Sequence, residues 1–302
     1  MSNTIDLLKD ELLMIANPSR YIGGEYTQNK KIPQEGDLRC AICFPDLYEI
    51  GMSNTAIKII YDQLNRIEGI HWDRVFSVAP DFEALLRKKN LSLYTLQTHQ
   101  SLNDLDFLGV SIGYELAATN ILQVLELGKI PLHTKDRGDD DPIVIAGGPA
   151  ITNPLPFGSF LDFVYIGEAE GGLQPVVEAL KEAKAKKFTR KEKIELLQRF
   201  NYLWYAGKKA TLRFIDHDFA NEARFEHFVV PHMKVTQDNG VVEIMRGCPS
   251  GCRFCHAGQF YKPYRQKELS VIEEEVGQFV DEYGYREITL SSLSSGDHPQ
   301  IS

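Results

Sequence analysis

The sequence predicts an α/β protein: a doubly wound, mostly parallel sheet in the N-terminal part, followed by the start of a second α/β unit. Three observations support this prediction. Short apolar runs alternate with amphipathic helical patterns from residue 38 to residue 187, which is typical of strands joined by helical crossovers. The composition, 43% hydrophobic and 25% charged, is ordinary for a globular protein of 302 residues. A further strand-like run, Val241–Met245, leads directly into a loop with three cysteines.

The predicted elements follow one another in a regular order. In the first helix, Ile57, Ile60 and Leu64 fall on one face, as expected for a helix packed on a sheet. The strands are expected at Leu38–Phe44, Arg74–Val78, Phe107–Ile112, Ile143–Ala146 and Phe163–Ile166. The helices are expected at Thr55–Ile67, Asp81–Lys89, Leu116–Leu127 and Pro175–Lys187.

The chain is expected to divide into four parts. The charged run from Lys181 to Arg199 marks the junction after the first domain. Further on, Asn239-Gly240 predicts a hairpin or tight turn that leads into a strand. The four parts are an N-terminal helical segment (1–36), an α/β domain (37–187), a connecting region (188–235) and the second unit (236–302).

Charge and cysteine usage exclude several classes of protein. The 33 Lys and Arg against 42 Asp and Glu leave a net charge of -9. This disfavours a nucleic-acid coat or a binder of anionic membranes, although an RNA substrate in a local basic groove is not excluded. No apolar run reaches the length of a membrane span, and the N-terminus has an acidic amphipathic pattern rather than that of a signal peptide. Because five cysteines also do not form a secreted disulfide framework, the sequence predicts a cytoplasmic protein without a membrane partner.

The candidate metal ligands are Cys248, Cys252 and Cys255, which follow the predicted strand as C-x3-C-x2-C. Three thiolates so close together, on a loop with Gly251, can converge on one small centre. Thiolates are the usual ligands of iron–sulfur clusters, and three of them without a fourth favour a cluster with one open iron. The pattern therefore predicts a catalytic rather than a purely structural cluster.

A zinc site is the alternative, with His256 or the pair Cys40 and Cys43 as further ligands. Structural zinc sites prefer C-x2-C pairs and four protein ligands, and a histidine directly beside Cys255 is poorly placed to complete a tetrahedron. Cys40 and Cys43 lie three residues apart in a predicted strand, so they point to opposite faces and are expected to be buried structural residues.

Two other motifs have alternative interpretations. Gly147-Gly148 after a predicted strand fits a cofactor-binding turn, but a sharp turn without a ligand explains it as well. Glu168 and Glu170 fit an acid–base pair, but we expect them to cap the helix that follows.

The cysteine segment resembles the signature of radical S-adenosylmethionine (SAM) enzymes, in which an aromatic residue, here Phe254, precedes the third cysteine. The order of the next elements also matches: Ser270 and Glu273 form a capping-box pattern that opens a helix, and Glu287–Ser292 is a strand pattern. In the N-terminal half, the motifs Gly147-Gly148-Pro149, Asn153-Pro154, Gly167-Glu168-Ala169-Glu170 and Pro45–Asn54 resemble the cobalamin-binding-type domain of one bacterial subgroup.

The resemblance implies a cobalamin-binding-like domain followed by a partial (β/α) barrel. It implies a 4Fe–4S cluster on the three cysteines and reductive cleavage of SAM, with an electron donor such as flavodoxin or ferredoxin and an unknown substrate. It also implies cofactor contacts from Phe254, from Gly147 and Gly148, and from the loop after the second barrel strand. That loop, which binds the amino group of SAM in the family, is here Ser294, Ser295, Gly296 and Asp297 in place of Gly-Gly-Glu.

Two interpretations of cobalamin binding agree with the sequence. Cobalamin domains that place a histidine on cobalt use the motif D-x-H-x-x-G, and none of the eight histidines has an aspartate two residues before it. Cobalamin without a histidine ligand, or a domain that keeps the fold and has lost the ligand, both agree with this pattern.

The last expectation concerns the length of the second unit. After Cys248 the chain has room for the cysteine loop, one helix and one strand, whereas the family barrel has several more βα units. A sheet edge and an apolar helix face would then remain uncovered. We expect a truncated form that assembles a labile cluster but does not turn over SAM. The alternative is a non-catalytic fragment that binds zinc or no cofactor.

Overall fold

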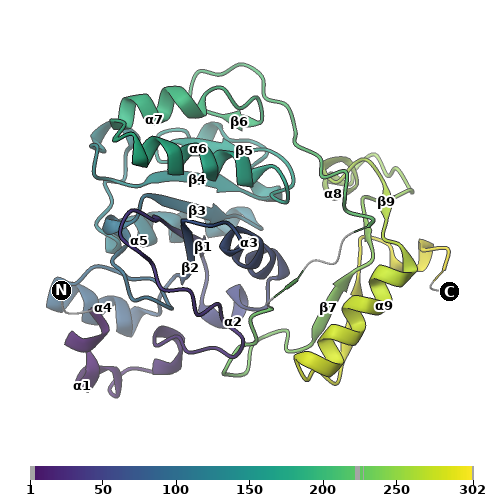
Figure 1. Ribbon diagram of the computed structural model, residues 1–302, viewed down its shortest axis with the longest axis horizontal. Helices are drawn as coiled ribbons and strands as arrows, with labels where there is room; N and C mark the ends of the chain where they lie inside the picture. The colour runs from purple at the N-terminus through teal and green to yellow at the C-terminus, as the bar shows by residue number, and fades with distance from the viewer. Residues whose placement is uncertain (1–3, 222–224, 227, 301–302) are drawn as a thin grey trace.

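A six-stranded sheet with the strand order β2-β1-β3-β4-β5-β6 forms the N-terminal part of the protein (Figure 1). The computed structural model describes residues 4–221, 225, 226 and 228–300. Strands β1 to β5 run parallel, and β6 pairs antiparallel with β5. The predicted α/β fold with a parallel sheet is therefore confirmed. The strands are β1 (Leu38–Phe44), β2 (Ile70–Phe76), β3 (Phe107–Ser111), β4 (Ile143–Gly147), β5 (Phe163–Tyr165) and β6 (Leu203–Trp204).

Helices cover both faces of this sheet. They are α1 (Lys9–Leu12), α2 (Tyr48–Gly51), α3 (Thr55–Asn65), α4 (Pro80–Lys89), α5 (Ala118–Leu127), α6 (Leu173–Ala185) and α7 (Arg190–Leu197). One buried core contains Phe82 of α4 and Val124 of α5, and a second core contains Tyr61 of α3 and Val177 of α6. Strands buried on both faces are nearly continuous apolar runs, which is why the sequence predicts β1, β3, β4 and β5 close to their observed bounds.

Strand β2 begins at Ile70, earlier than the predicted Arg74–Val78. The prediction missed its first half because polar residues interrupt the apolar pattern there. His71 and Asp73 are both buried. The Nε2 atom of His71 lies 3.1 Å from the carbonyl oxygen of Lys31. The carboxylate of Asp73 accepts hydrogen bonds from the backbone amides of Gln97 and Thr98. Polar side chains with such partners are tolerated in a buried strand.

Strand β6 lies in the region 188–235, which the sequence assigned to a connection between domains. Leu203 pairs with Tyr165 and Trp204 with Val164, so the chain adds an edge strand to the same sheet. Helix α7 precedes this strand, and a capping box on Thr189 closes its N-terminus. The sheet therefore extends beyond residue 187.

The C-terminal part is a small α/β unit in which two helices lie between the strands of a parallel pair. Its elements are β7 (Gly240–Glu243), β8 (Met245–Arg246), α8 (His256–Phe260), β9 (Arg265–Gln266), α9 (Leu269–Gly277) and β10 (Ile288–Ser291). Strands β7 and β10 pair in parallel, and β8 pairs antiparallel with β9. Because β7 has a parallel partner, Asn239-Gly240 is a turn that leads into a strand and not the turn of a hairpin.

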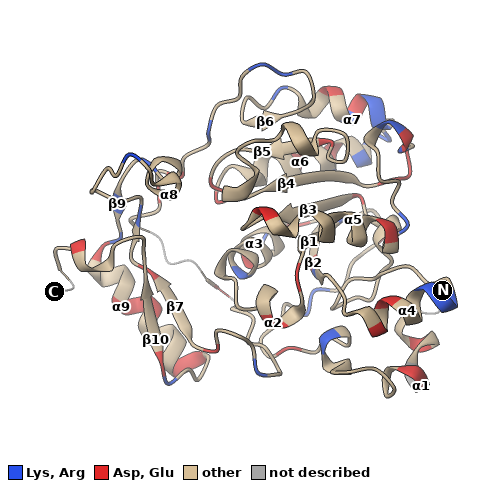
Figure 2. Ribbon diagram, turned by 180° about the vertical axis from the view of Figure 1, so that it is seen from behind, with Lys and Arg blue, Asp and Glu red and all other residues tan. Residues whose placement is uncertain are grey.

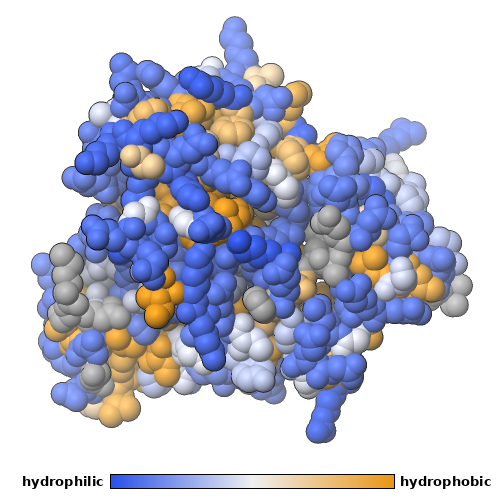
Figure 3. All heavy atoms as spheres, in the orientation of Figure 1, coloured by the Kyte–Doolittle hydropathy of each residue, from blue (hydrophilic) through white to orange (hydrophobic). Residues whose placement is uncertain are grey.

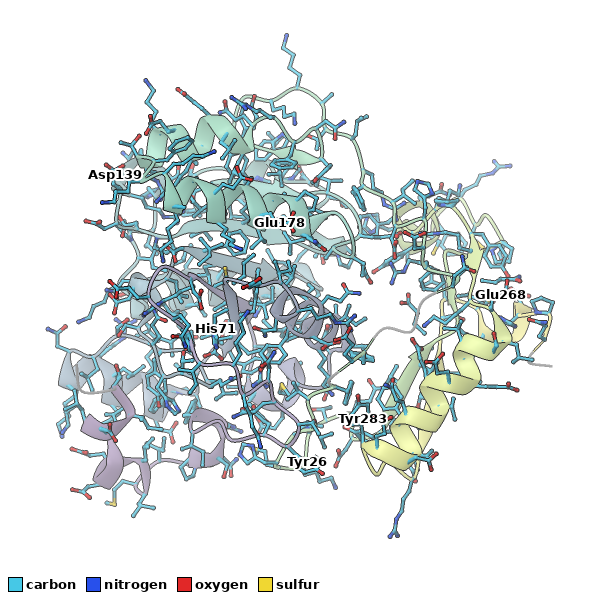
Figure 4. The ribbon with its side chains drawn as sticks, in the orientation of Figure 1. Tyr26, His71, Asp139, Glu178, Glu268 and Tyr283 are labelled. Atoms are coloured by element: carbon cyan, nitrogen blue, oxygen red, sulfur yellow. The ribbon has the colours of Figure 1, made fainter. Side chains whose placement is uncertain are left out.

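Helix α9 begins after Glu268 (labelled in Figure 4) and not at Ser270. Ser270 already lies in the first turn, so the predicted capping box of Ser270 and Glu273 is wrong. The predicted apolar face is present, since Ile272 and Phe279 are both buried. A π-helical turn, residues 278–282, continues the helix.

The N-terminal and C-terminal parts share a buried apolar cluster. Ile59 of α3 belongs to the same cluster as Phe228, Phe279 and Tyr283. The backbone amide of Phe228 donates a hydrogen bond to the hydroxyl of Tyr283 (labelled in Figure 4), 3.2 Å away. Hydrophilic residues, in blue, cover most of the face seen in Figure 3. Among the described residues, no helix is both long enough and apolar enough to span a membrane.

Candidate functional site

A cavity of about 560 Å³ lies where the parallel strands of the large sheet end. Ser111 at the end of β3 and Gly147 at the end of β4 form one wall, and Glu243 of β7 and Leu293 after β10 line the side of the C-terminal unit. In open parallel sheets, ligands bind beyond the carboxyl ends of the strands, where the strand order reverses. Here the order reverses between β1 and β3. The cavity thus lies where this fold favours a cofactor or substrate, and its volume is in the usual range.

The predicted cofactor glycines, Gly147 and Gly148, both line this cavity. Gly148 has a φ of +117°, and a Cβ atom there would lie 2.4 Å from the carbonyl oxygen of Ile112. Only glycine therefore lets the loop after β4 pack against the end of β3. Gly113, also in the wall, is different, because a Cβ atom there would meet no heavy atom within 4 Å. The structure places these glycines at the cavity, and their cofactor contacts stay a prediction.

The cysteine loop is an excursion between two short paired strands. It leaves the β8 strand after Arg246 and returns at Arg265 of β9, and these two residues are opposite each other in the ladder. Gly247 begins the excursion with a φ of +84°, and a Cβ atom there would lie 2.9 Å from the carbonyl oxygens of Tyr261 and Pro263. The start and end of the loop are therefore packed closely against each other. Gly251, within the loop, also has a positive φ, of +64°.

The three predicted ligands lie on this excursion with different exposure. Cys248 and Cys255 are half-buried and Cys252 is exposed. The sulfur of Cys255 caps helix α8 and accepts a hydrogen bond from the backbone amide of Gly258, at 3.3 Å. In the part of the chain that the structure describes, no three His, Cys, Asp or Glu side chains are gathered closely enough to hold a metal ion. The donor set still fits a cluster, since it consists of three thiols on one short loop.

The other two cysteines lie on opposite faces of the large sheet. Cys40 and Cys43 of β1 are both fully buried and belong to different cores. Burial raises the pKa of both thiols above the usual value. The prediction of buried structural cysteines is thus confirmed, and neither faces the cysteine loop.

The remaining predicted cofactor contacts lie outside the cavity wall. Phe254 is 92% exposed at the outer side of the cysteine loop. The cavity reaches Ser292 and Leu293 after β10, and the predicted residues follow directly after them. There, the hydroxyl of Ser294 donates to the carboxylate of Asp297 at 2.7 Å, and residues 295–297 form one 3-10 turn. A Cβ atom on Gly296 would meet nothing within 4 Å.

The structure also reveals an ion cluster that sequence reasoning missed. Glu168 and Glu170 do not cap helix α6, whose N-cap residue is Gly172. The carboxylate of Glu168 binds Arg246, Arg265 and a third arginine, Arg213. Burial alone would raise the pKa of Glu168, but the hydrogen bond from Arg265 and the charge of Arg246 outweigh it and lower this pKa. No local sequence pattern signals such a cluster, because its members are far apart in the chain.

A second contact connects the cysteine loop to the loop after β4. The Nε2 atom of His256, next to Cys255, lies 3.2 Å from the hydroxyl oxygen of Thr152. The ring of His256 also stacks on Phe260. His256 therefore contacts the N-terminal domain through Nε2.

Two models of known families match this chain. Residues 56–205 match the family described as radical SAM proteins, N-terminal, and residues 242–301 match the radical SAM superfamily. The chain therefore belongs to the radical SAM proteins. The first match ends at residue 205, which agrees with the extent of the large sheet.

Two kinds of relatives are similar to this chain. An uncharacterized protein of Methanocaldococcus jannaschii is 24% identical over 274 residues, which cover 86% of this chain and 50% of that protein. The solved structures of TsrM, a radical SAM methyltransferase from Kitasatospora setae, cover 86% of this chain. The structure with cobalamin and a [4Fe-4S] cluster has a TM-score of 0.50 at 13% identity over 49% of its chain. The structure with tryptophan and a SAM analogue has a TM-score of 0.49 at 14% identity over 48% of its chain.

These relatives are about twice as long as the matched region. The chain spans about half the length of the curated relative and of the solved structures that it matches. At such low identity, the structural likeness is evidence for the fold alone.

Proposed function

We propose that this protein is a radical SAM enzyme in which Cys248, Cys252 and Cys255 bind a 4Fe–4S cluster. The observation that carries the proposal is the cysteine excursion, which offers three thiols on one loop, beside a parallel strand and next to a cavity. When bound, such a cluster supplies the electron that cleaves SAM reductively, and the resulting radical abstracts hydrogen from a substrate. Family membership supports this chemistry, while the substrate is unassigned.

The chain's own residues bind and orient the reactants. The three thiols must deprotonate and move together, so cluster binding orders the loop as metal sites generally do. Ser294 and Asp297 offer a hydroxyl and a carboxylate for the amino group of SAM. The neighbouring cavity, lined mainly by apolar side chains, excludes water from the reaction.

Anaerobic reconstitution with iron and sulfide tests the ligand assignment. The wild-type chain should take up iron, absorb broadly near 400 nm and, when reduced, give an electron paramagnetic resonance signal that changes on addition of SAM. Replacement of any one of the three ligands by Ala should abolish stable iron uptake. Cys40→Ala is the matched control, because Cys40 is buried in β1, away from the loop.

Two outcomes would contradict the proposal. One is the loss of iron in the Cys40→Ala variant to the same extent as in the ligand variants. The other is zinc bound in a 1:1 ratio with no iron after reconstitution, which would support the alternative of a non-catalytic metal-binding protein.

We further propose that the cavity holds a corrinoid, the class of cofactor in the TsrM structure with cobalamin. The small residues Gly113, Gly147 and Gly148 in the cavity wall let a large, flat group approach the backbone. No histidine belongs to the described cavity wall, so such a corrinoid would bind without a protein histidine on cobalt.

Titration with hydroxocobalamin tests the corrinoid proposal. Gly113→Leu puts a side chain into open space at the cavity wall, and we expect it to weaken binding by about tenfold or more through steric exclusion. Gly277→Leu on α9 is the matched control, since a Cβ atom there also meets no heavy atom within 4 Å. Equal binding by both variants would contradict the assignment of the cavity. A histidine-ligated cobalt spectrum that disappears on mutation of one histidine would contradict the ligation.

The partners of the reaction follow from the same chemistry. Reductive cleavage needs a one-electron donor, and we propose a flavodoxin or ferredoxin for this role. We propose that the substrate approaches at the side of this cavity that the C-terminal unit lines, with Glu243 of β7 and Leu293 after β10.

A further inference from the structure

Two arginines face each other at the base of the cysteine excursion. Arg246 of β8 and Arg265 of β9 are direct partners in the antiparallel ladder. Like charges directly opposite each other destabilise a strand pair. Between Glu243 and Glu268 the sequence has no Asp or Glu and five Lys or Arg, and Figure 2 shows basic residues in blue around β9. The loop segment itself therefore contains no carboxylate that could compensate this repulsion.

A carboxylate that binds both of these arginines comes from the N-terminal domain. Glu168, in the loop after β5, lies between the two guanidinium groups: its Oε2 atom is 2.8 Å from Nη1 of Arg265 and 3.2 Å from Nη1 of Arg246. Its side chain is only 5% exposed. Hydrogen bonds between charged groups in such a buried setting are stronger than neutral ones.

The loop that carries Glu168 is itself held in place. Gly167 has a φ of +133°, and a Cβ atom there would lie 2.3 Å from the carbonyl oxygen of Phe214. The backbone amide of Asp216 donates a hydrogen bond to Oε2 of Glu168 at 2.9 Å. The carboxylate is therefore preorganised before the arginines bind it.

Arg246 connects this anchor to the cavity and to the first predicted ligand. Its side chain is 8% exposed and also binds Glu170 at 3.0 Å and Glu243 at 2.6 Å. Both Glu168 and Arg246 line the cavity. Cys248 is only two residues after Arg246. The contacts that fix the guanidinium of Arg246 therefore also fix the position of the first residues of the cysteine loop.

We propose that Glu168 is a positioning residue, which fixes the base of the cysteine excursion against the N-terminal domain and so holds the cluster site at the cavity. This inference rests on the proposed function for the role of the cluster. The anchoring itself is a property of the polypeptide and can be measured without iron.

Hydrogen exchange of the 302-residue chain tests the anchoring. Glu168→Gln keeps the shape of the side chain, removes its charge and leaves Arg246 and Arg265 without the carboxylate that they share. We expect amides 247–264, including that of Tyr261, which donates to Ala257 at 3.0 Å, to exchange about tenfold faster or more, as for loss of a charged hydrogen bond.

The matched control is Asp162→Asn in the same domain. The carboxylate of Asp162 is also buried and binds two arginines, Arg137 at 3.1 Å and Arg190 at 2.6 Å, but it does not touch the cysteine excursion. This variant should leave exchange in 247–264 unchanged. If Asp162→Asn accelerates exchange there as much as Glu168→Gln does, the effect is general destabilisation and the proposal is wrong.

A double variant makes the test specific for the facing charges. In Glu168→Gln/Arg265→Gln the repulsion is gone, so protection of 247–264 should recover to within about threefold of the wild type. No recovery would overturn the proposal, as would wild-type exchange in Glu168→Gln. Should Glu168→Gln not fold, Arg265→Lys serves instead: it keeps the charge, loses the fork geometry, and should accelerate exchange in the same residues only.

After reconstitution, the reduced cluster of Glu168→Gln should show an altered paramagnetic resonance spectrum or midpoint potential relative to the wild type and Asp162→Asn. An unchanged spectrum and potential would refute the effect on the cluster. If the wild type binds no iron, the proposed function fails, while the exchange measurements still decide whether Glu168 anchors the loop.

Discussion

Lys58 provides a quantitative prediction about stability and pH. It lies on α3, is only 4% exposed, and its Nζ atom is 4.2 Å from the centre of the Phe228 ring. Among the described residues, no carboxylate lies within ion-pair distance of this ammonium group. Burial, together with the charge of Arg74, lowers the pKa of Lys58 to about 7, and the charge of Asp238 opposes this only in part.

The lowered pKa means that charged Lys58 destabilises the folded state. In the unfolded chain its pKa returns to about 10.5, so between about pH 7 and pH 10.5 the unfolded state binds more protons and stability rises with pH. At and below pH 7 the full cost applies, about 5 kcal/mol at 1.36 kcal/mol per pKa unit. The contact with the Phe228 ring offsets about 0.5–2 kcal/mol of it. Lys58→Met should therefore raise the free energy of unfolding at neutral pH by about 3 kcal/mol.

Urea unfolding of the wild type and Lys58→Met, followed by circular dichroism at about pH 6.5, 8 and 9.5, measures this effect. The advantage of the variant should be largest at the lowest pH and should shrink as pH rises. Lys191→Met is the control, because the Lys191 side chain is 86% exposed, and it should show no such pH dependence. A variant less stable than the wild type near pH 6.5, or an advantage that does not change with pH, would refute the reasoning.

Two further predictions concern the sheet. Gly148→Ala should lower the free energy of unfolding by about 2 kcal/mol or more, because its Cβ atom would collide with the carbonyl oxygen of Ile112 at a positive φ; a urea midpoint equal to that of the wild type would contradict this. Iodoacetamide should label the exposed Cys252 of the native, iron-free chain quickly. Cys40 and Cys43, whose pKa values are raised by burial, should react only after unfolding, and equally fast labelling of either thiol in the native chain would show that β1 is not buried as described.

The elements that the sequence predicted well are those with a strong local pattern. Strand β1 has the predicted bounds Leu38–Phe44, because all of its residues except Arg39 are apolar or small. The opposite placement of Cys40 and Cys43 followed from the alternation of side chains along a strand. Strand β2 was only half predicted, since the polar His71 and Asp73 are buried with partners that the local pattern does not contain.

The class of fold could be predicted from the sequence, because period-2 and period-3.6 apolar patterns report which face of an element is buried. The three candidate ligands could also be proposed from the sequence, because all three cysteines lie within eight residues of each other. Which distant residues meet could be read only from the three-dimensional structure. Glu168 and Arg265 are 97 residues apart in the chain, and nothing near either of them signals their pairing. The same holds for β6, which is too short to show an apolar pattern in the sequence. It forms by antiparallel pairing with the edge of β5. Contacts of this kind depend on how the packed elements are arranged relative to one another, and local periodicity carries no information about this arrangement.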